Sequence, residues 1–127
     1  MTNFGSLYSK QVLKHFQNPQ NVGEIKNPDG TATVGNPVCG DVMRMFLRVE
    51  KNKIKDIKFQ TLGCGAAIAT SSVITQMAKG KSLQEADKIS KQKVVKALGG
   101  LPASKLHCSV LAVEALQKAI ANYRQKK

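Results

Sequence analysis

The sequence predicts an α+β fold in which helices pack on a three-stranded antiparallel sheet. Three observations predict it. The spacing of apolar residues is helical near the start of the chain, alternates as in β-strands in the middle, and is helical again after Gly63. Only Lys51-Asn52 joins the two longer strand segments, and so short a link suits a hairpin of antiparallel strands. A run of strands followed by a run of helices is typical of α+β domains.

Length and composition predict one domain. The chain has 127 residues, 42% of them hydrophobic, and shows no repeat or linker, so we expect a single domain over residues 1–127. No apolar run approaches the roughly 18 residues of a membrane span, and the first residues lack an apolar signal segment. The expectation is therefore a cytoplasmic protein that does not contact membranes.

The first element is an amphipathic helix over residues 6–17, with Ser6 as its N-cap. It ends at Asn18-Pro19, because proline disfavours the helical conformation in the residue before it. Its histidine, His15, is expected to be a surface or packing residue.

Three strands are expected over residues 31–34, 42–50 and 53–61. In the second strand, alternation places four apolar residues on one face: Met43, Met45, Leu47 and Val49. In the third strand Ile54 falls on the opposite face from Ile57 and Phe59, so the core face is less clean there.

The rest of the chain is predicted to be helical. Residues 66–79 are apolar on most sides, which predicts a largely buried helix that ends at Gly80. Ser82 and Glu85 fit a capping box that opens a short helix, and Ser90 caps another that ends at Gly99-Gly100. The last helix spans residues 107–124, and its expected apolar stripe consists of Val110, Val113, Leu116 or Gln117, and Ile120.

The charge is strongly positive, at +12 for the whole chain. Residues 88–127 hold eight Lys and one Arg against one acid, Glu114, a net charge of +8. This excess is either a solvated helical surface or a surface that attracts an acidic partner. Nucleic acid binding is the weaker interpretation, because no helix-turn-helix, zinc-finger or RNP-like motif is present and aromatic residues are only 5%.

Three cysteines, Cys39, Cys64 and Cys108, each lie at a junction between predicted elements. Rigid folds often present reactive groups at such junctions, and a helix N-terminus, expected near Cys64 and Cys108, favours a thiolate. Asp41 and His107 flank two of the cysteines and add an oxygen and a nitrogen ligand. Taken singly, each Cys could pack in the core, Asp41 could cap a turn and His107 could open a helix. Together they predict a metal or sulfur site.

The chain resembles the IscU and NifU N-terminal-domain family of iron–sulfur cluster assembly scaffolds. The resemblance begins at Tyr8-Ser9 and ends at His107-Cys108-Ser109, nearly the whole chain. The matching blocks are His15-Phe16-Gln17-Asn18-Pro19, Asn21-Val22-Gly23, Gly35-Asn36-Pro37-Val38-Cys39-Gly40-Asp41, Gly63-Cys64-Gly65-Ala66-Ala67-Ile68-Ala69, Lys79-Gly80-Lys81-Ser82 and Leu101-Pro102.

This resemblance implies a SufE-like α+β architecture on which a transient 2Fe–2S cluster is assembled and then passed to apo-proteins. A cysteine desulfurase would supply sulfur, ferrous iron would be bound, and a ferredoxin-type protein would supply electrons. Cys39, Cys64 and Cys108 are the implied cluster ligands, with Asp41 or His107 as the fourth. Cys108 is the implied first persulfide acceptor. The same ligands suit Zn²⁺, which the isolated protein can carry.

The function expected is that of a scaffold and carrier rather than an enzyme. The expected assembly is a homo-oligomeric or cluster-bridged form, in which two copies share a cluster.

Two departures from the family pattern matter. The segment read by the family's DnaK-type chaperone is usually Leu-Pro-Pro-Val-Lys, whereas this chain has Leu101-Pro102-Ala103-Ser104-Lys105, which weighs against docking of that chaperone. The C-terminal cluster domain of full NifU is absent, so a stand-alone scaffold is expected.

The competing interpretation is a zinc-dependent, SufU-like sulfur acceptor that stimulates a desulfurase. The SufU branch lacks the His before its third Cys and carries an insertion, so His107 favours the IscU branch.

Overall fold

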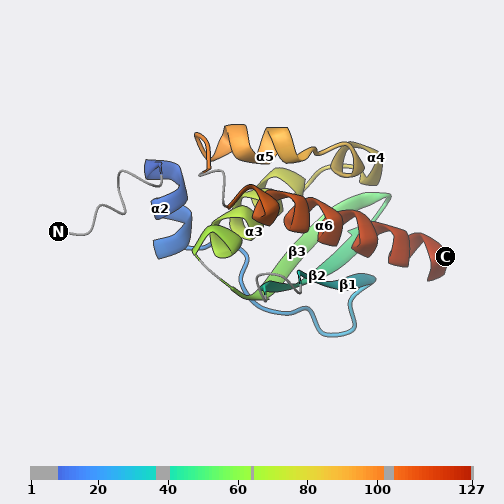
Figure 1. Ribbon diagram of the computed structural model, residues 1–127. Helices are drawn as coiled ribbons and strands as arrows, with labels where there is room; N and C mark the ends of the chain where they lie inside the picture. Colours follow the sequence, from blue (N-terminus) through green and yellow to red (C-terminus); the bar gives the residue numbers. More distant parts are fainter. Residues whose placement is uncertain (1–8, 37–40, 64, 102–104, 127) are drawn as a thin grey trace.

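The computed structural model describes residues 9–36, 41–63, 65–101 and 105–126 (Figure 1). It confirms the predicted α+β fold, with one helix, three strands and four further helices among the described residues. The elements are α2 (Lys10–Gln17), β1 (Gly30–Asn36), β2 (Asp41–Glu50), β3 (Lys53–Leu62), α3 (Gly65–Ala78), α4 (Leu83–Asp87), α5 (Lys91–Ala97) and α6 (Leu106–Lys126).

The sheet is antiparallel with strand order β1-β2-β3. The β2–β3 hairpin is the predicted one, and its two link residues, Lys51 and Asn52, have φ values of 53° and 63°. Positive φ at both turn positions matches the right-handed twist of the strands, which is why tight hairpins use this turn. The two turn residues, Lys51 and Asn52, therefore help to set the register between β2 and β3.

A bulge explains the uneven pattern of β3. Arg48 pairs with Asp56 but Val49 pairs with Ile54, which leaves Lys55 as an extra residue on β3. The extra residue turns Ile54 onto the same face as Ile57, and both are fully buried. The strict alternation expected from the sequence was therefore wrong at this end of the strand.

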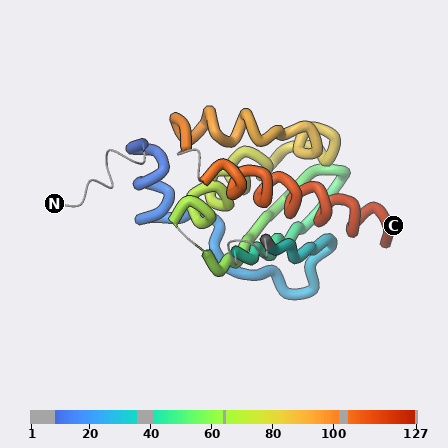
Figure 2. The backbone as a smooth tube through the Cα atoms, in the orientation of Figure 1, coloured from blue at the N-terminus to red at the C-terminus, as the bar shows by residue number. Residues whose placement is uncertain are grey.

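Helices cover one face of the sheet (Figures 1 and 2). α6 packs on β1 and β2, and α3 packs on β3. α4 and α5 form an outer layer that contacts both α3 and α6, while α2 packs on α3. None of the described helices is long and apolar enough to cross a membrane.

The buried face of α6 includes Leu116 and Ile120, as predicted, and Val113 packs against the core, but the stripe fails at Val110. Val110 is 42% exposed, and Gln117 also faces solvent. The buried residues of α6 are Cys108, Ser109, Leu111, Ala112, Ala115, Leu116, Ala119 and Ile120. The small alanines let the helix lie close to β1, where a Cβ added to Gly30 would come within 2.5 Å of the Ala119 carbonyl oxygen. The prediction weighted large side chains, whereas close packing here selects small ones.

Helix caps follow local sequence with one correction. Ser82 forms the predicted capping box with Glu85, and Ser90 caps α5 as predicted. The N-cap of α2 is Ser9 rather than Ser6, which lies outside the described residues. Ser9 accepts a hydrogen bond from the Val12 amide and donates one to the Leu98 carbonyl, so a tertiary contact joins the local cap at this position.

Candidate metal site

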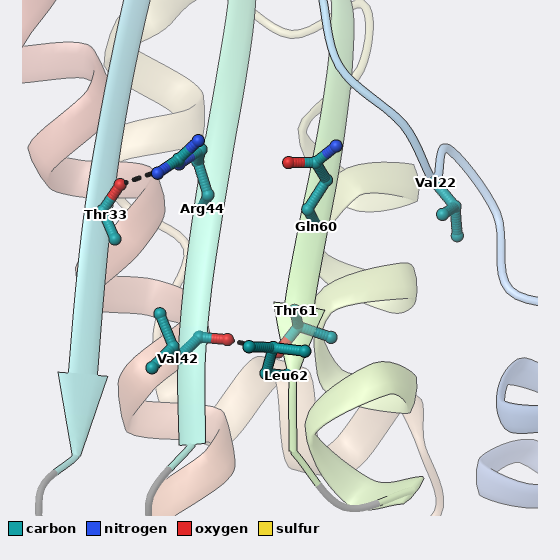
Figure 3. Close-up of a pocket in the computed structure, with 7 residues that line it drawn as sticks. All are labelled: Val22, Thr33, Val42, Arg44, Gln60, Thr61 and Leu62. Atoms are coloured by element: carbon teal, nitrogen blue, oxygen red, sulfur yellow. Dashed lines mark hydrogen bonds between the residues drawn. The ribbon is translucent and has the colours of Figure 1, made fainter.

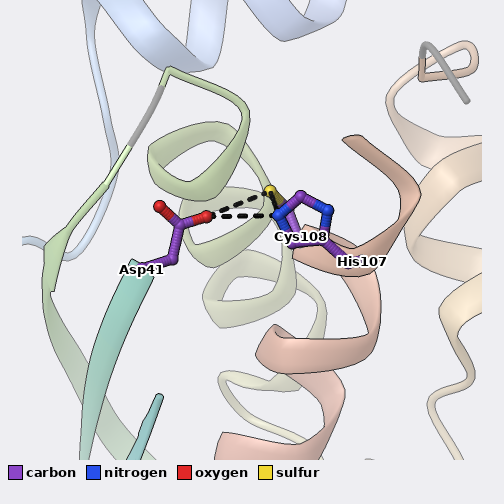
Figure 4. A group of neighbouring side chains, drawn as sticks. All are labelled: Asp41, His107 and Cys108. Carbon is purple, nitrogen blue, oxygen red and sulfur yellow. Dashed lines mark hydrogen bonds and ion pairs between the residues drawn. The ribbon is translucent and has the colours of Figure 1, made fainter. Parts of the chain in front are cut away.

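Three potential metal ligands meet where β2 begins and α6 begins (Figure 4). Asp41 is the first residue of β2, and His107 and Cys108 lie in the first turn of α6. His107 Nε2 lies 3.4 Å from Asp41 Oδ2 and 3.5 Å from Cys108 Sγ, and Cys108 Sγ lies 3.6 Å from Asp41 Oδ2. Each of the three donor atoms is thus within reach of the other two.

These spacings match those of ligands around one tetrahedral ion. Zinc-type bond lengths are about 2.3 Å to sulfur and about 2.0–2.1 Å to nitrogen or oxygen. At tetrahedral angles such bonds place the donor atoms about 3.3–3.6 Å apart. The three side chains could therefore hold a metal ion with little rearrangement, leaving a further position for another ligand.

Burial differs among the three ligands. Cys108 is fully buried and Asp41 is 4% exposed, whereas the His107 side chain is 30% exposed. Low local polarity strengthens electrostatic attraction to a bound cation. The partly open His107 side supplies a route by which an ion or a partner can approach.

Small residues shape the surroundings of the site. Cys108 packs against Ala66 and Ala67 in the first turn of α3. A Cβ added to Gly63 would lie 2.5 Å from Asp41 Oδ1, so the chain passes directly beside the carboxylate. A Cβ on Gly65 would lie 3.1 Å from the Phe16 ring, which brings α2 against the same turn. A side chain at either position would therefore have to displace its neighbour, the Asp41 carboxylate at Gly63 and the Phe16 ring at Gly65.

Of the five predicted site residues, the structure brings Asp41, His107 and Cys108 together. Cys39 and Cys64 lie outside the described residues. So do residues 102–104, which belong to the segment compared with the family's chaperone motif. The described residues next to them are at this site: Asp41 follows Cys39 by two positions, and Gly63 directly precedes Cys64.

A polar anchor that the sequence interpretation missed holds α2 on α3. His15 Nδ1 lies 2.7 Å from Ser72 Oγ, which also accepts a hydrogen bond of 2.8 Å from the Gln20 amide. Burial, with a smaller effect from the Lys14 charge, lowers the pKa of His15 below its ordinary value. The prediction of a packing residue was incomplete because the partner is 57 positions away in sequence. The hydroxyl residues within the largely buried α3, Ser72 among them, are the signal that could have indicated it.

A shallow hollow lies on the sheet face turned away from the helices (Figure 3). It has a volume of about 520 Å³, and Val42 and Leu62 in its lining are 37% and 74% exposed. Arg44 donates a hydrogen bond of 3.1 Å to Thr33 Oγ1 within it. Val42 directly follows Asp41 in β2, and successive strand residues point to opposite faces, so the hollow and the candidate metal site lie on opposite faces of the sheet.

Comparison with known proteins identifies relatives over nearly the whole chain. The family model for the NifU-like N-terminal domain matches residues 7–127. The chain is 59% identical to the "Iron-sulfur cluster assembly scaffold protein IscU 1" of Archaeoglobus fulgidus, over 94% of this chain and 78% of that protein. It is 48% identical to the "Iron-sulfur cluster assembly enzyme IscU" of Drosophila melanogaster, over 95% of this chain and 80% of that protein.

Solved structures share the fold. The SufU crystal structure from Fervidobacterium islandicum superposes with a TM-score of 0.77 at 21% identity, covering 92% of this chain and 98% of that one. At that identity the likeness concerns the fold alone. Together, the family match over residues 7–127 and the extensive sequence identity to its relatives show that the chain belongs to the NifU-like N-terminal domain family.

Proposed function

We propose that this protein is an iron–sulfur cluster assembly scaffold, which builds a 2Fe–2S cluster and transfers it to apo-proteins. The observation that carries the proposal is the Asp41–His107–Cys108 group, whose donor atoms lie 3.4–3.6 Å apart. Its relatives are named as cluster assembly scaffolds, which supports the same role here. The cluster is the cargo of this protein, and residues 1–127 act as one scaffold unit that turns over no substrate of its own.

The proposed cluster ligands are Cys39, Cys64 and Cys108, with Asp41 or His107 in the fourth place. Support comes from the described neighbours: Gly63, next to Cys64, abuts the Asp41 carboxylate, and Cys108 packs on the turn that follows Cys64. Iron in 2Fe–2S clusters accepts thiolates and, in some proteins, imidazole. The donor set therefore suits this cargo.

A carboxylate ligand would make the cluster easy to release. Oxygen is a harder donor than thiolate and a weaker partner for iron in a sulfide cluster. Asp41 is already buried beside Cys108, so it would compete for the position without a large movement. Easy release suits a donor of clusters and would handicap a permanent electron carrier.

The sulfur step requires a nucleophilic thiolate, for which we propose Cys108. Its thiolate attacks the terminal sulfur of the desulfurase persulfide, forming a new S–S bond as the desulfurase cysteine departs as a thiolate. The transferred sulfur is at the zero oxidation level, so its conversion to sulfide consumes two electrons. A ferredoxin-type protein supplies them, and ferrous iron then binds the sulfide. The partners are thus a cysteine desulfurase, an electron donor and apo-acceptors.

The test is anaerobic reconstitution with a cysteine desulfurase, L-cysteine, a reductant and ferrous iron, followed by incubation with apo-ferredoxin. We expect a visible sulfide-to-iron absorption band that moves to the acceptor. Cys39→Ser, Cys64→Ser and Cys108→Ser should each weaken assembly, whereas Ser109→Ala, at the neighbouring buried position, should retain it. Normal assembly by all three cysteine variants would show that the ligand set is wrong.

The zinc-dependent sulfur acceptor is the second candidate function, because the same donor spacing also suits Zn²⁺. It predicts a colourless protein with one tightly held zinc that nevertheless accelerates the desulfurase. That result in the reconstitution would replace the scaffold proposal with the sulfur-acceptor one.

A further inference from the structure

A groove between α5 and α6 opens beside the metal site. It has a volume of about 390 Å³, and its lining includes Lys91 and Val95 from α5 and Leu106, His107 and Val110 from α6. Leu106 and Val110 are 43% and 42% exposed, which makes them two of the most exposed large apolar residues of the described chain. The sequence placed Val110 in the apolar stripe of the last helix, yet its side chain does not pack in the core of the described structure.

One cation, Lys91, lines the groove, and α5 carries two further lysines outside its lining. α5 carries Lys91, Lys93 and Lys96 and no acidic residue, and all three are exposed. The ion pairs of the described residues include none of these lysines. Lys91 and Lys93 lie in the first turn of α5, where the helix dipole repels cations, so their presence costs stability.

No acidic side chain offsets this charge among the described lining residues of the groove. Glu114, the single acid of residues 88–127, is paired with Lys118 at 2.9 Å. Lys91 is therefore unopposed within the lining, and together with the net charge of +8 over residues 88–127 it would draw an acidic segment towards the groove.

The groove also reaches the metal ligands. His107 is part of its lining and at the same time lies 3.4 Å from Asp41 and 3.5 Å from Cys108. Whatever occupies the groove would touch the exposed side of the site. Its position is suited to a protein that exchanges sulfur, electrons or a cluster with the site.

We propose that this α5–α6 groove docks an acidic protein segment that places an apolar side chain on Leu106 and Val110 and a carboxylate against Lys91. Nucleic acid fits less well: its phosphates would gain from Lys91, but the described lining holds no Phe, Tyr or Trp on which a base could stack. The inference rests on the proposed function in one respect: a cluster scaffold needs partners that bind next to its metal site.

The test measures binding directly. The probe is a fluorescent synthetic peptide with a central Leu-Leu pair flanked by runs of glutamate, titrated by anisotropy with the full chain at low salt. Lys91→Glu and Val110→Ser should each weaken binding by at least about threefold. Their matched controls are Lys126→Glu, at the far end of α6, and Val22→Ser, at an exposed valine outside this groove, and both should bind nearly as wild type. Circular dichroism checks that every variant is folded.

A second readout locates the peptide. The His107 ring signals in the NMR spectrum should shift on binding, and a peptide with Ser-Ser in place of Leu-Leu should bind more weakly. Equal weakening by the control variants, equal affinity for the Ser-Ser peptide, or no binding at all would overturn the inference. So would tighter binding of a duplex DNA oligonucleotide that is indifferent to Val110→Ser. Failure of cluster assembly with intact peptide binding would instead overturn the proposed function and leave the groove as a docking surface.

Discussion

Asp41 has contacts that a capping residue would not need. It is buried, it lies 3.6 Å from a thiol and 3.4 Å from an imidazole, and the chain passes close by at Gly63. Burying a carboxylate is costly unless other groups compensate it. A cation bound at this point would supply that compensation, which is the reason to test this residue first.

Asp41→Ala is expected to retain a reconstituted cluster longer than the wild type, because a hard oxygen ligand is replaced by a stronger ligand from the remaining set. The measurement is the rate at which absorbance moves to apo-ferredoxin, which we expect to fall by about tenfold, equivalent to about 1.4 kcal/mol. Asp56→Ala removes a carboxylate from β3, outside the metal site, and should transfer at the wild-type rate. Equal or faster loss of the cluster from Asp41→Ala would contradict a ligand role.

Gly63→Ala is expected to displace the Asp41 carboxylate, since the added Cβ would meet Oδ1 at 2.5 Å and Cγ at 2.9 Å. Metal affinity, measured by competition with a chromophoric chelator, should fall. The urea midpoint should change little, because the atoms that the new Cβ meets most closely are the end of a side chain rather than backbone. Gly35→Ala is the control: its Cβ would be 3.6 Å from the Asp41 backbone oxygen, an ordinary contact. Unchanged affinity in Gly63→Ala would show that this crowding is harmless.

At the scale of elements, α2 is held on α3 by a polar contact and an aromatic one. His15 bonds to Ser72, and the Phe16 ring covers Gly65 at the start of α3. The lowered pKa of His15 means that the folded protein disfavours its protonated form. The unfolded chain binds this proton near pH 6.5, so stability is complete above that value and falls as the pH drops below it.

His15→Gln should flatten this dependence. Urea unfolding of wild type and variant at several values between about pH 7.5 and 5 tests it, since the unfolded histidine titrates near 6.5. We expect the wild type to lose more stability than His15→Gln on acidification. Parallel pH profiles would mean that the His15–Ser72 contact does not discriminate against the proton.

Local signals predicted local structure well. The hairpin at Lys51-Asn52 and the caps at Ser82 and Ser90 follow from the preferences of a few adjacent residues, and all are confirmed. The placement of Ile54 on the opposite face from Ile57 and that of Val110 in the apolar stripe of α6 were wrong, because both depend on a partner element. Periodicity within one segment records neither the register of the opposite strand nor how closely a helix approaches a sheet.

At the scale of the whole molecule, the site combines segments that are distant in the chain. Sequence motifs indicated which residue types carry the chemistry, and Asp41, His107 and Cys108 do meet in space. Their spacing and unequal exposure could not be predicted, because they depend on how α6 lies on the sheet. Cys39 and Cys64 stay predictions, since both lie outside the described residues.

Zinc is expected to stabilise the whole fold, because a metal that binds the native state alone shifts unfolding by mass action. At a free concentration of one hundred times Kd the gain is about 2.7 kcal/mol. Differential scanning fluorimetry should therefore show a higher Tm with zinc, reversed by EDTA. Cys108→Ser should show a much smaller shift, whereas Ser109→Ala should respond as wild type. A Tm indifferent to zinc and EDTA would rule out a folded-state metal site.

Gly30 lies at the other end of α6 from the metal ligands, yet it sets their position. Ala119 rests on it, and the Thr31 amide donates a hydrogen bond to the Asn122 side chain nearby. Cys108 is on the same rigid helix, about 16 Å along its axis at 1.5 Å per residue. In a survey of sequence variation, Gly30 should consequently tolerate few replacements, although it packs at the far end of α6 from the candidate metal ligands. Intolerance to substitution in this family is therefore a poor guide to which residues perform the chemistry.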